Sequence, residues 1–230
     1  SFKIERALAR IQYDSYRQDR WAESALHPAT RHPLPKANDY LNNAKAALLS
    51  SRAGAAQLLL AVNGEGQVVG YAHWVHGPQN EAASLKALYV APEGKRLGAG
   101  RLLMDRIVSD ARARGNSRLE WLTSVTGYIF YIHYLADRLP YRFGNNRFTA
   151  YVGQVAGGED FIQRYPAAVL AQRRYRNRVL DQIRSSDLRP NSDGRTGGKM
   201  QPFDVRPYLV TDADLQSTAS SAGARLAQGT

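Results

Sequence analysis

Apolar positions along the chain follow two different periods, which together predict a mixed α/β (α+β) protein. Apolar residues recur at helical steps in some stretches, whereas short apolar or alternating runs bounded by Gly, Pro or Asn mark strands. The helical stretches are residues 9–26, 38–52, 100–115 and 127–139. The predicted strands are residues 2–7, 56–63, 67–76, 83–91, 117–125 and 146–157. Because the central strands follow one another through short turns, we expect a mostly antiparallel twisted sheet flanked by helices, not a doubly wound parallel repeat.

Composition narrows the class of protein. The chain has no cysteine, which excludes disulfides, thiolate zinc sites and cysteine nucleophiles and fits a cytoplasmic protein, or a nuclear one in a eukaryote. No apolar run approaches ~18 residues, and no basic-then-apolar leader is visible, so we expect neither a membrane partner nor a signal peptide. The histidines are scattered without metal-ligand spacing, so no metal site is expected. The net charge of +11 favours an anionic partner, although it also fits solubility alone.

The stretch VAPEGKRLGAGRLLMDRI, residues 90–107, places glycines between a predicted strand and the clearest predicted helix. The N–H groups at a helix N-terminus are unpaired and partly positive, and glycines let an anion approach them. The Walker pattern requires Lys-Ser/Thr after its last glycine, and the dinucleotide fingerprint requires a third glycine. The chain has Arg101, Leu102 and Leu103 at these places. The glycines therefore mark either a pyrophosphate cradle or a plain strand-to-helix turn.

The same stretch resembles the acyl-CoA-binding motif of the GNAT superfamily of N-acetyltransferases, written Q/R-x-x-G-x-G/A. The positions in register are Leu88, Val90, Pro92, Glu93, Gly98, Gly100, Leu102 and Leu103. The chain departs from the motif at Lys95, where the family has Gln or Arg, and at Arg96, where it very often has Gly. The resemblance extends over roughly residues 2–151, with FKIERAL in the place of the family's first strand and LLLAVNGEGQVVGYAHWV in that of its next hairpin.

This resemblance implies the GNAT acyl-CoA N-acyltransferase fold, with acetyl-CoA as the donor and a primary amine on a small molecule or a protein as the acceptor. It further implies that main-chain groups of the strand pair with the pantetheine arm and that the N–H groups of the glycine turn hold the pyrophosphate. The implied cofactor-binding residues are Leu88, Tyr89, Val90, Lys95, Arg96, Leu97, Gly98, Ala99, Gly100 and Arg101.

Three residues are candidates for proton transfer. The stretch SVTGYIFY resembles the family's S-P-x-G-x-x-L-Y, which puts Tyr131 in the place of the tyrosine general acid, although the Gly-Phe pair that usually follows is absent. His73, whose side chain ordinarily titrates near neutrality, and Glu81, just before the strand at 83–91, are candidate bases. Each has a structural alternative: a packed aromatic, a half-buried strand histidine and a solvated loop carboxylate.

Three regions are expected along the chain: a GNAT-like acetyltransferase domain at 1–156, a basic helical extension at 157–186, and a linker with a flexible tail at 187–230. The extension carries Arg173, Arg174, Arg176, Arg178 and Arg184. A basic helix of this kind can dock on nucleic acid or an acidic protein, so the alternative function is a catalytically impaired binding module. Within the tail, FDVRPYLVTDADL at 203–215 again resembles a family first strand, as a truncated repeat would.

Overall fold

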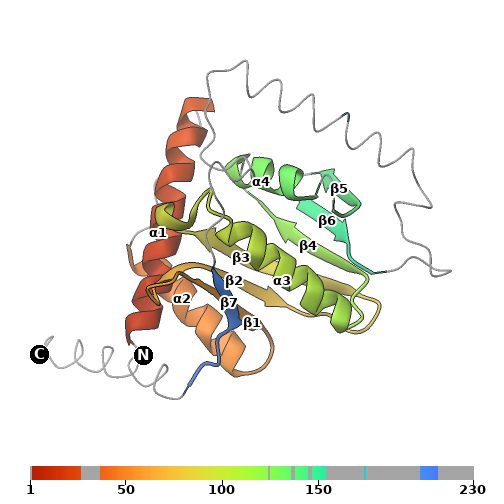
Figure 1. Cartoon of the computed structure of the whole chain (residues 1–230), viewed down its shortest axis with the longest axis horizontal. Coiled ribbons are helices and arrows are strands. Elements are labelled where there is room, and N and C mark those ends of the chain that lie inside the picture. Colours follow the sequence, from red (N-terminus) through yellow and green to blue (C-terminus); the bar gives the residue numbers. More distant parts are fainter. Residues whose placement is uncertain are drawn as a thin grey trace, which may run out of the picture.

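The computed structural model describes residues 2–26, 37–123, 125–135, 138–144, 147–153, 174 and 203–211. These residues form one seven-stranded sheet with helices on both faces (Figure 1). The helices are α1 (Phe2–Leu26), α2 (Ala37–Arg52), the 3-10 turn η1 (Pro92–Gly94), α3 (Ala99–Ala113) and α4 (Val125–Leu135). The strands are β1 (Gln57–Val62), β2 (Val68–Val75), β3 (Ala82–Val90), β4 (Arg118–Leu122), β5 (Tyr141–Gly144), β6 (Arg147–Tyr151) and β7 (Asp204–Pro207).

The strand order across the sheet is β5-β6-β4-β3-β2-β1-β7, and every pair of neighbours is antiparallel except β3 and β4. This confirms the expected mixed α/β architecture with a mostly antiparallel central sheet. Within the described part of the chain, no helix is both long and apolar enough to cross a membrane. The expected basic helix lies outside the described residues, except for Arg174.

The first residues of the chain form a helix, so the expected strand at 2–7 is wrong. Ile4, Leu8 and Ile11 of α1 are all buried, and their spacing of four and three residues is that of one helix face. They pack with Tyr40 of α2 and with strand residues in a single cluster. The alternation in FKIERAL is too short to fix a period, and the packing of the buried positions from Ile4 to Ile11 selects the helix.

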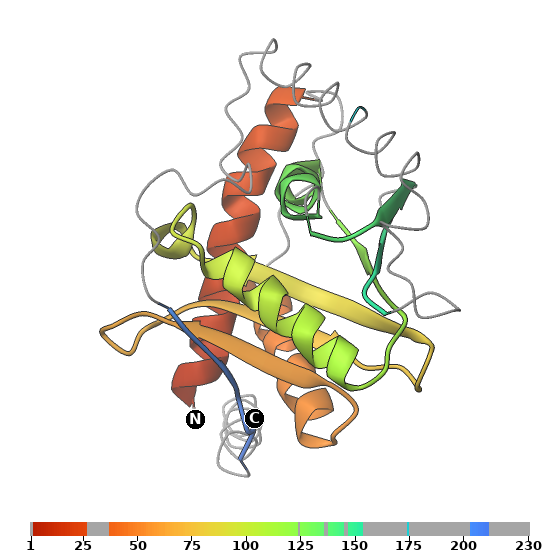
Figure 2. The ribbon, with the colours of Figure 1, turned by 45° about the vertical axis from the view of Figure 1, so that its right-hand side comes forward.

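Each face of the sheet has its own apolar cluster. On one face, α1 and α2 cover alternate side chains of β1 and β2, such as Leu58, Leu60 and Tyr71. On the other face, α3 and α4 cover Leu59, Trp74 and their neighbours on the same side. Figure 2 shows α3 in front of the strands, with α1 and α2 behind them. We refer to these as the α1/α2 face and the α3/α4 face.

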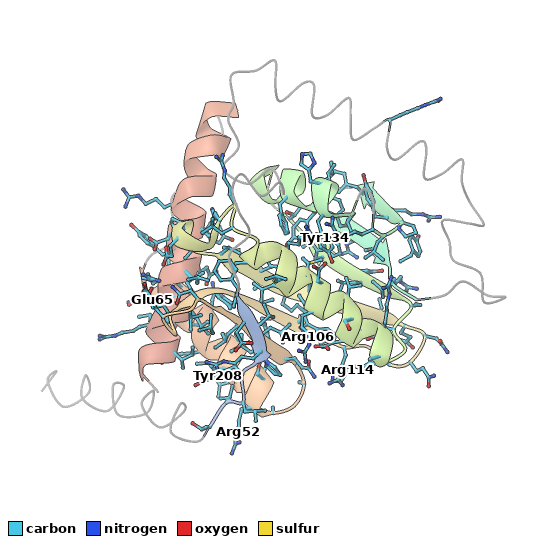
Figure 3. The ribbon with its side chains drawn as sticks, viewed as in Figure 1. Arg52, Glu65, Arg106, Arg114, Tyr134 and Tyr208 are labelled. Carbon is cyan, nitrogen blue, oxygen red and sulfur yellow. The ribbon has the colours of Figure 1, made fainter. Side chains whose placement is uncertain are left out.

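The strand at the β1 edge of the sheet comes from the far end of the sequence. β7 pairs antiparallel with β1, and the Tyr208 N–H then donates to the Leu58 carbonyl at 2.8 Å. Arg52 of α2 donates to the Val210 carbonyl at 3.2 Å, and Val210 is buried in the α1/α2 cluster. Figure 3 shows Arg52 and Tyr208 together at this edge.

The segment at 203–211 therefore differs from the flexible tail expected over 187–230. Part of this segment is indeed a strand, β7. It adds to this domain's own sheet and does not begin a repeat. Pairing with β7 covers the edge of β1, whose main-chain hydrogen-bonding groups would otherwise be unpaired. The rest of the tail lies outside the described residues.

Candidate functional site

The strands β3 and β4 separate part of the way along the sheet. They pair only at Ala82–Ser84 with Arg118–Glu120. Past that point β3 stays paired with β2 as far as Val90, and β4 stays paired with β6 as far as Leu122. The facing edges of β3 and β4 thus have no ladder between them in the described residues. Such edges present main-chain donors and acceptors to an extended ligand.

A bulge lies on β3 just where the strands separate. His73 of β2 is opposite Ala87, but the next residue, Trp74, is opposite Leu85, so Lys86 is the extra residue. Because side chains alternate between faces, the bulge shifts the phase of the strand and sends Leu85 and Leu88 to the same face. No feature of the sequence predicts this bulge, since it depends on the pairing with β2.

The predicted strand residues of the site keep their side chains away from the gap. Leu88 and Val90 pack in the α3/α4 cluster. The Tyr89 ring contacts those of Tyr16 and Tyr71 on the other face, with centroids 5.8 and 5.6 Å away, and burial there raises the pKa of its hydroxyl. This leaves the main chain of β3 along the gap, as a pantetheine-binding strand requires.

The glycine turn leads from β3 to α3 beside the open end of the gap. The first hydrogen bond of α3 runs from the Leu102 N–H to the carbonyl of the N-cap residue Gly98 at 3.0 Å. The N–H groups of Ala99 and Gly100 come before this bond and so have no acceptor within the helix. The Lys95 N–H is already bonded to the Ala91 carbonyl at 3.1 Å. The usable cradle therefore begins after Lys95, at the α3 N-terminus. Leu97 is half-buried. Arg101 lies in the first turn of α3, and its Nε is 3.8 Å from Oδ2 of Asp105.

Two residues of the turn have left-handed backbone. Gly98, the N-cap of α3, has φ 102°, and Arg96 has φ 61°. The first suits glycine, which has no Cβ to clash. The second places an arginine where the family motif most often has glycine, and a left-handed conformation costs a non-glycine residue about 1–2 kcal/mol. The departure noted in the sequence is thus a point of backbone strain.

We expect Arg96→Gly to raise the free energy of unfolding by about 1 kcal/mol, because glycine removes this strain. Denaturant unfolding measures the change. The matched control is Asn80→Gly, since Asn80 has φ 63° but asparagine tolerates this region. We expect a smaller gain there, and equal gains at both positions would contradict the explanation.

Helix α4 packs against the N-terminal end of α3, where the glycine turn leads into the helix. A Cβ on Gly100 would lie 3.3 Å from Cζ of Phe130, so the two helices meet here as closely as glycine allows. Further along α4, the Tyr134 hydroxyl donates to Asp105 of α3 at 2.8 Å, and Figure 3 shows Tyr134 between these helices. Burial and the Asp105 carboxylate raise the pKa of Tyr134, which keeps its hydroxyl neutral. The sequence did not single out Phe130 or Asp105, because both contacts join distant segments.

Tyr131 lies on α4 next to Phe130, on the α3/α4 face. It is 6% exposed, and its ring centroid is 4.9 Å from that of Trp121 and 5.6 Å from that of Phe148. Trp121 belongs to β4 at the separated end of the gap. The residue is therefore packed, as its structural alternative supposed, and it is also beside the gap, as the general-acid role requires.

His73 lies on β2 next to the bulge, with its side chain on the α1/α2 face. Nε2 is 2.9 Å from Oγ of Ser50 on α2, and the Ser50 hydroxyl reaches the Ala47 carbonyl at 3.1 Å. Burial, with a smaller contribution from the positive charge of Lys86, lowers the pKa of His73. The imidazole is therefore neutral at pH 7, the state that a general base needs.

The two carboxylates near β3 and β4 lie in different places. Glu81 is exposed in the turn before β3, at the paired end, and the structure does not bring it to the gap. Glu120 is opposite Ser84 in the last pair before the strands separate. Its side chain is on the α1/α2 face and is 28% exposed. Glu81 is a candidate base in the sequence because it adjoins the cofactor strand, and the structure places it at the end of β3 that pairs with β4.

The family model for the acetyltransferase (GNAT) family matches residues 14–129, which is half of the chain. The chain belongs to the GNAT acetyltransferase family. A search of curated proteins finds no match for it.

Solved GNAT structures resemble the chain at low identity. The PaiA N-acetyltransferase of Thermoplasma acidophilum, in complex with coenzyme A, is 14% identical, with a TM-score of 0.48 over 65% of this chain and 92% of that one. A GNAT acetyltransferase of Brucella melitensis, in complex with acetyl-CoA, is 15% identical, with a TM-score of 0.42 over 69% and 85%. One from Staphylococcus aureus is 18% identical, with a TM-score of 0.40 over 60% and 94%.

The residues of this chain fit acetyl-CoA, the co-substrate that GNAT membership implies. The α3 N-terminus offers N–H groups to an anion, Gly98 adds no Cβ in front of them, and a strand with an unladdered edge leads away from the turn. Tyr131 and His73 lie on opposite faces beside this strand, whereas Glu81 lies at its far end.

Proposed function

We infer that the chain is an N-acetyltransferase that transfers the acetyl group of acetyl-CoA directly to a primary amine. The observation that carries this is the joint presence of the α3 N-terminus and the separation of β3 from β4 directly beside it. With its pyrophosphate at the α3 N-terminus and its pantetheine arm extended in the gap between β3 and β4, acetyl-CoA would have its thioester near the Lys86 bulge.

The two faces of the sheet then have separate tasks. The amine reaches the thioester from the α1/α2 face, where His73 accepts its proton, directly or through water. The amine nitrogen forms the C–N bond as the C–S bond breaks. Tyr131, on the α3/α4 face, gives its proton to the departing thiolate. The proton acceptor for the amine and the proton donor for the thiolate thus act from opposite faces of the sheet.

Calorimetric titration with acetyl-CoA tests the proposal, followed by a screen of amines in which released thiol is measured. We expect a Kd near micromolar, about 8 kcal/mol of binding free energy. Absence of binding would overturn the proposal, because every other step depends on the donor.

The His73 assignment predicts a particular pH dependence. Because burial lowers the His73 pKa from 6.5, its basic form persists as the pH falls, and kcat/KM declines only below pH 6.5. We expect His73→Gln to lower kcat/KM by about 100-fold at pH 7 and to remove this acid limb. A pH–rate profile of both proteins checks the assignment. A limb that persists in the variant would assign it to another group.

A further inference from the structure

In the part of the chain that the structure describes, one face of the sheet is left open next to the gap. The α1/α2 face of β4, β6 and β5 carries Arg118, Glu120, Leu122, Arg142, Arg147, Thr149 and Tyr151, by the alternation and register of these strands. Leu122 is 69% exposed, and Arg118, Arg142 and Arg147 are exposed as well. Their exposure shows that, within the described residues, no helix covers this face, whereas α1 and α2 cover β1 and β2 on the same side.

The charges on this face do not balance. Glu120 accepts a hydrogen bond from Arg118 at 2.9 Å and lies 3.8 Å from Arg147. Arg142 lies over the Tyr151 ring, 5.9 Å from its centroid. Among the described residues of this face there is thus one carboxylate and three guanidinium groups, two beside Glu120 and one over Tyr151, which leaves this set of residues positive. Guanidinium groups bind carboxylates and phosphates through paired N–H donors, so the face complements an anionic oxyacid.

The positively charged face lies close to the gap between β3 and β4. Glu120 marks the point where the strands separate, and Arg147 is opposite Leu122, two residues further along β4. Arg142 is opposite Thr149, which is itself opposite Glu120. Spacings of about 7 Å between side chains on one face of a strand and about 5 Å between strands put both arginines roughly 7–10 Å from that point. A single small molecule with an amine at one end and an anionic group at the other spans this distance.

We propose that the acceptor is a small amine that also carries a carboxylate or phosphate group, and that Arg142 and Arg147 bind this anionic group on the open face. The amine then points to the gap between β3 and β4. This inference rests on the proposed acetyltransferase function and adds the chemical class of its acceptor.

The first experiment does not depend on knowing the acceptor. The full chain is saturated with CoA, which occupies the α3 N-terminus, and is then titrated with inorganic phosphate or acetate while the arginine Nε–H resonances are followed by NMR. We expect saturable shifts for the wild type and at least about fivefold weaker binding for the double variant Arg142→Gln/Arg147→Gln. Arg114→Gln is the control for the loss of a single positive charge, because Arg114 is an exposed arginine at the C-terminal end of α3 (Figure 3).

Each result of the titration has a definite meaning. Failure of CoA itself to bind would count against the proposed function. Normal CoA binding with no saturable anion shift, or with the same shift in the double variant, would overturn the anionic acceptor. An equal loss in Arg114→Gln would also overturn it, since net charge alone would then explain the binding.

The second experiment measures turnover and distinguishes a carboxylate-bearing acceptor from a phosphate-bearing one. We compare 4-aminobutyrate with n-butylamine, and O-phosphoethanolamine with ethanolamine, with acetyl-CoA saturating. A preference of at least tenfold in kcat/KM for one charged partner, lost in the double variant, supports the proposal and identifies carboxylate or phosphate. Equal use of charged and neutral amines would overturn it.

Discussion

Replacing Gly98 by tryptophan is expected to weaken acetyl-CoA binding by at least about 100-fold, or ~2.7 kcal/mol. Gly98 is buried at the N-cap of α3 with φ 102°. A tryptophan there strains the backbone and places its ring in front of the N–H groups that would hold the pyrophosphate. Calorimetric titration of the variant with acetyl-CoA measures the effect.

A second glycine provides the control for strain. Gly54 has φ 75°, and a Cβ there meets nothing within 4 Å. Gly54→Trp is expected to lower the free energy of unfolding by about 1–2 kcal/mol through backbone strain, without changing acetyl-CoA affinity. Wild-type affinity in Gly98→Trp would show that the pyrophosphate binds elsewhere. An equal loss of affinity in both variants would attribute it to destabilisation.

Removing the Tyr131 hydroxyl is expected to lower kcat by about 100-fold, with the Kd for acetyl-CoA changed less than about threefold. Phenylalanine keeps the ring that packs against Trp121 and Phe148, so the fold and the donor site are preserved. Only the proton for the departing thiolate is lost. Steady-state kinetics with an amine from the screen, together with calorimetry, separates the two effects.

Tyr134→Phe is the matched control on the same helix. It removes the 2.8 Å hydrogen bond to Asp105, so we expect the free energy of unfolding to fall by about 1–2 kcal/mol. Its kcat should stay within a few-fold of the wild type, because this hydroxyl ties α4 to α3. Unchanged kcat in Tyr131→Phe would remove Tyr131 from the mechanism, and an equal loss in Tyr134→Phe would point to helix position as the cause.

Local signals predicted the helix α3, the hairpin of β1 and β2, and the glycine turn. Each of these rests on contacts between residues near in sequence: apolar steps in Leu103 and Ile107, a GEG turn, and glycines before a helix. The same reasoning failed at the start of the chain, where the interior of α1 is decided by its packing against α2 and the sheet. It also missed β5, whose partner is fixed only once β6 is in place.

The candidate site shows the same division. Sequence comparison identified Gly98, Tyr131 and His73 by their place in a motif or by chemistry, and the tertiary structure assigns them to the turn and to opposite faces of the sheet. Glu81 and Glu120 look alike in the sequence, but only the register of β3 with β4 shows which one adjoins the gap.

The sequence by itself determined the family, the α/β class and the glycine turn before α3, because these depend on local periodicity and on glycine's freedom at the backbone. Only the tertiary structure decided the Lys86 bulge, the arginine face and the placement of β7 beside β1. These features arise from pairing between segments far apart in the chain, and the free energy of burying an edge or shifting a register is a property of the assembled sheet.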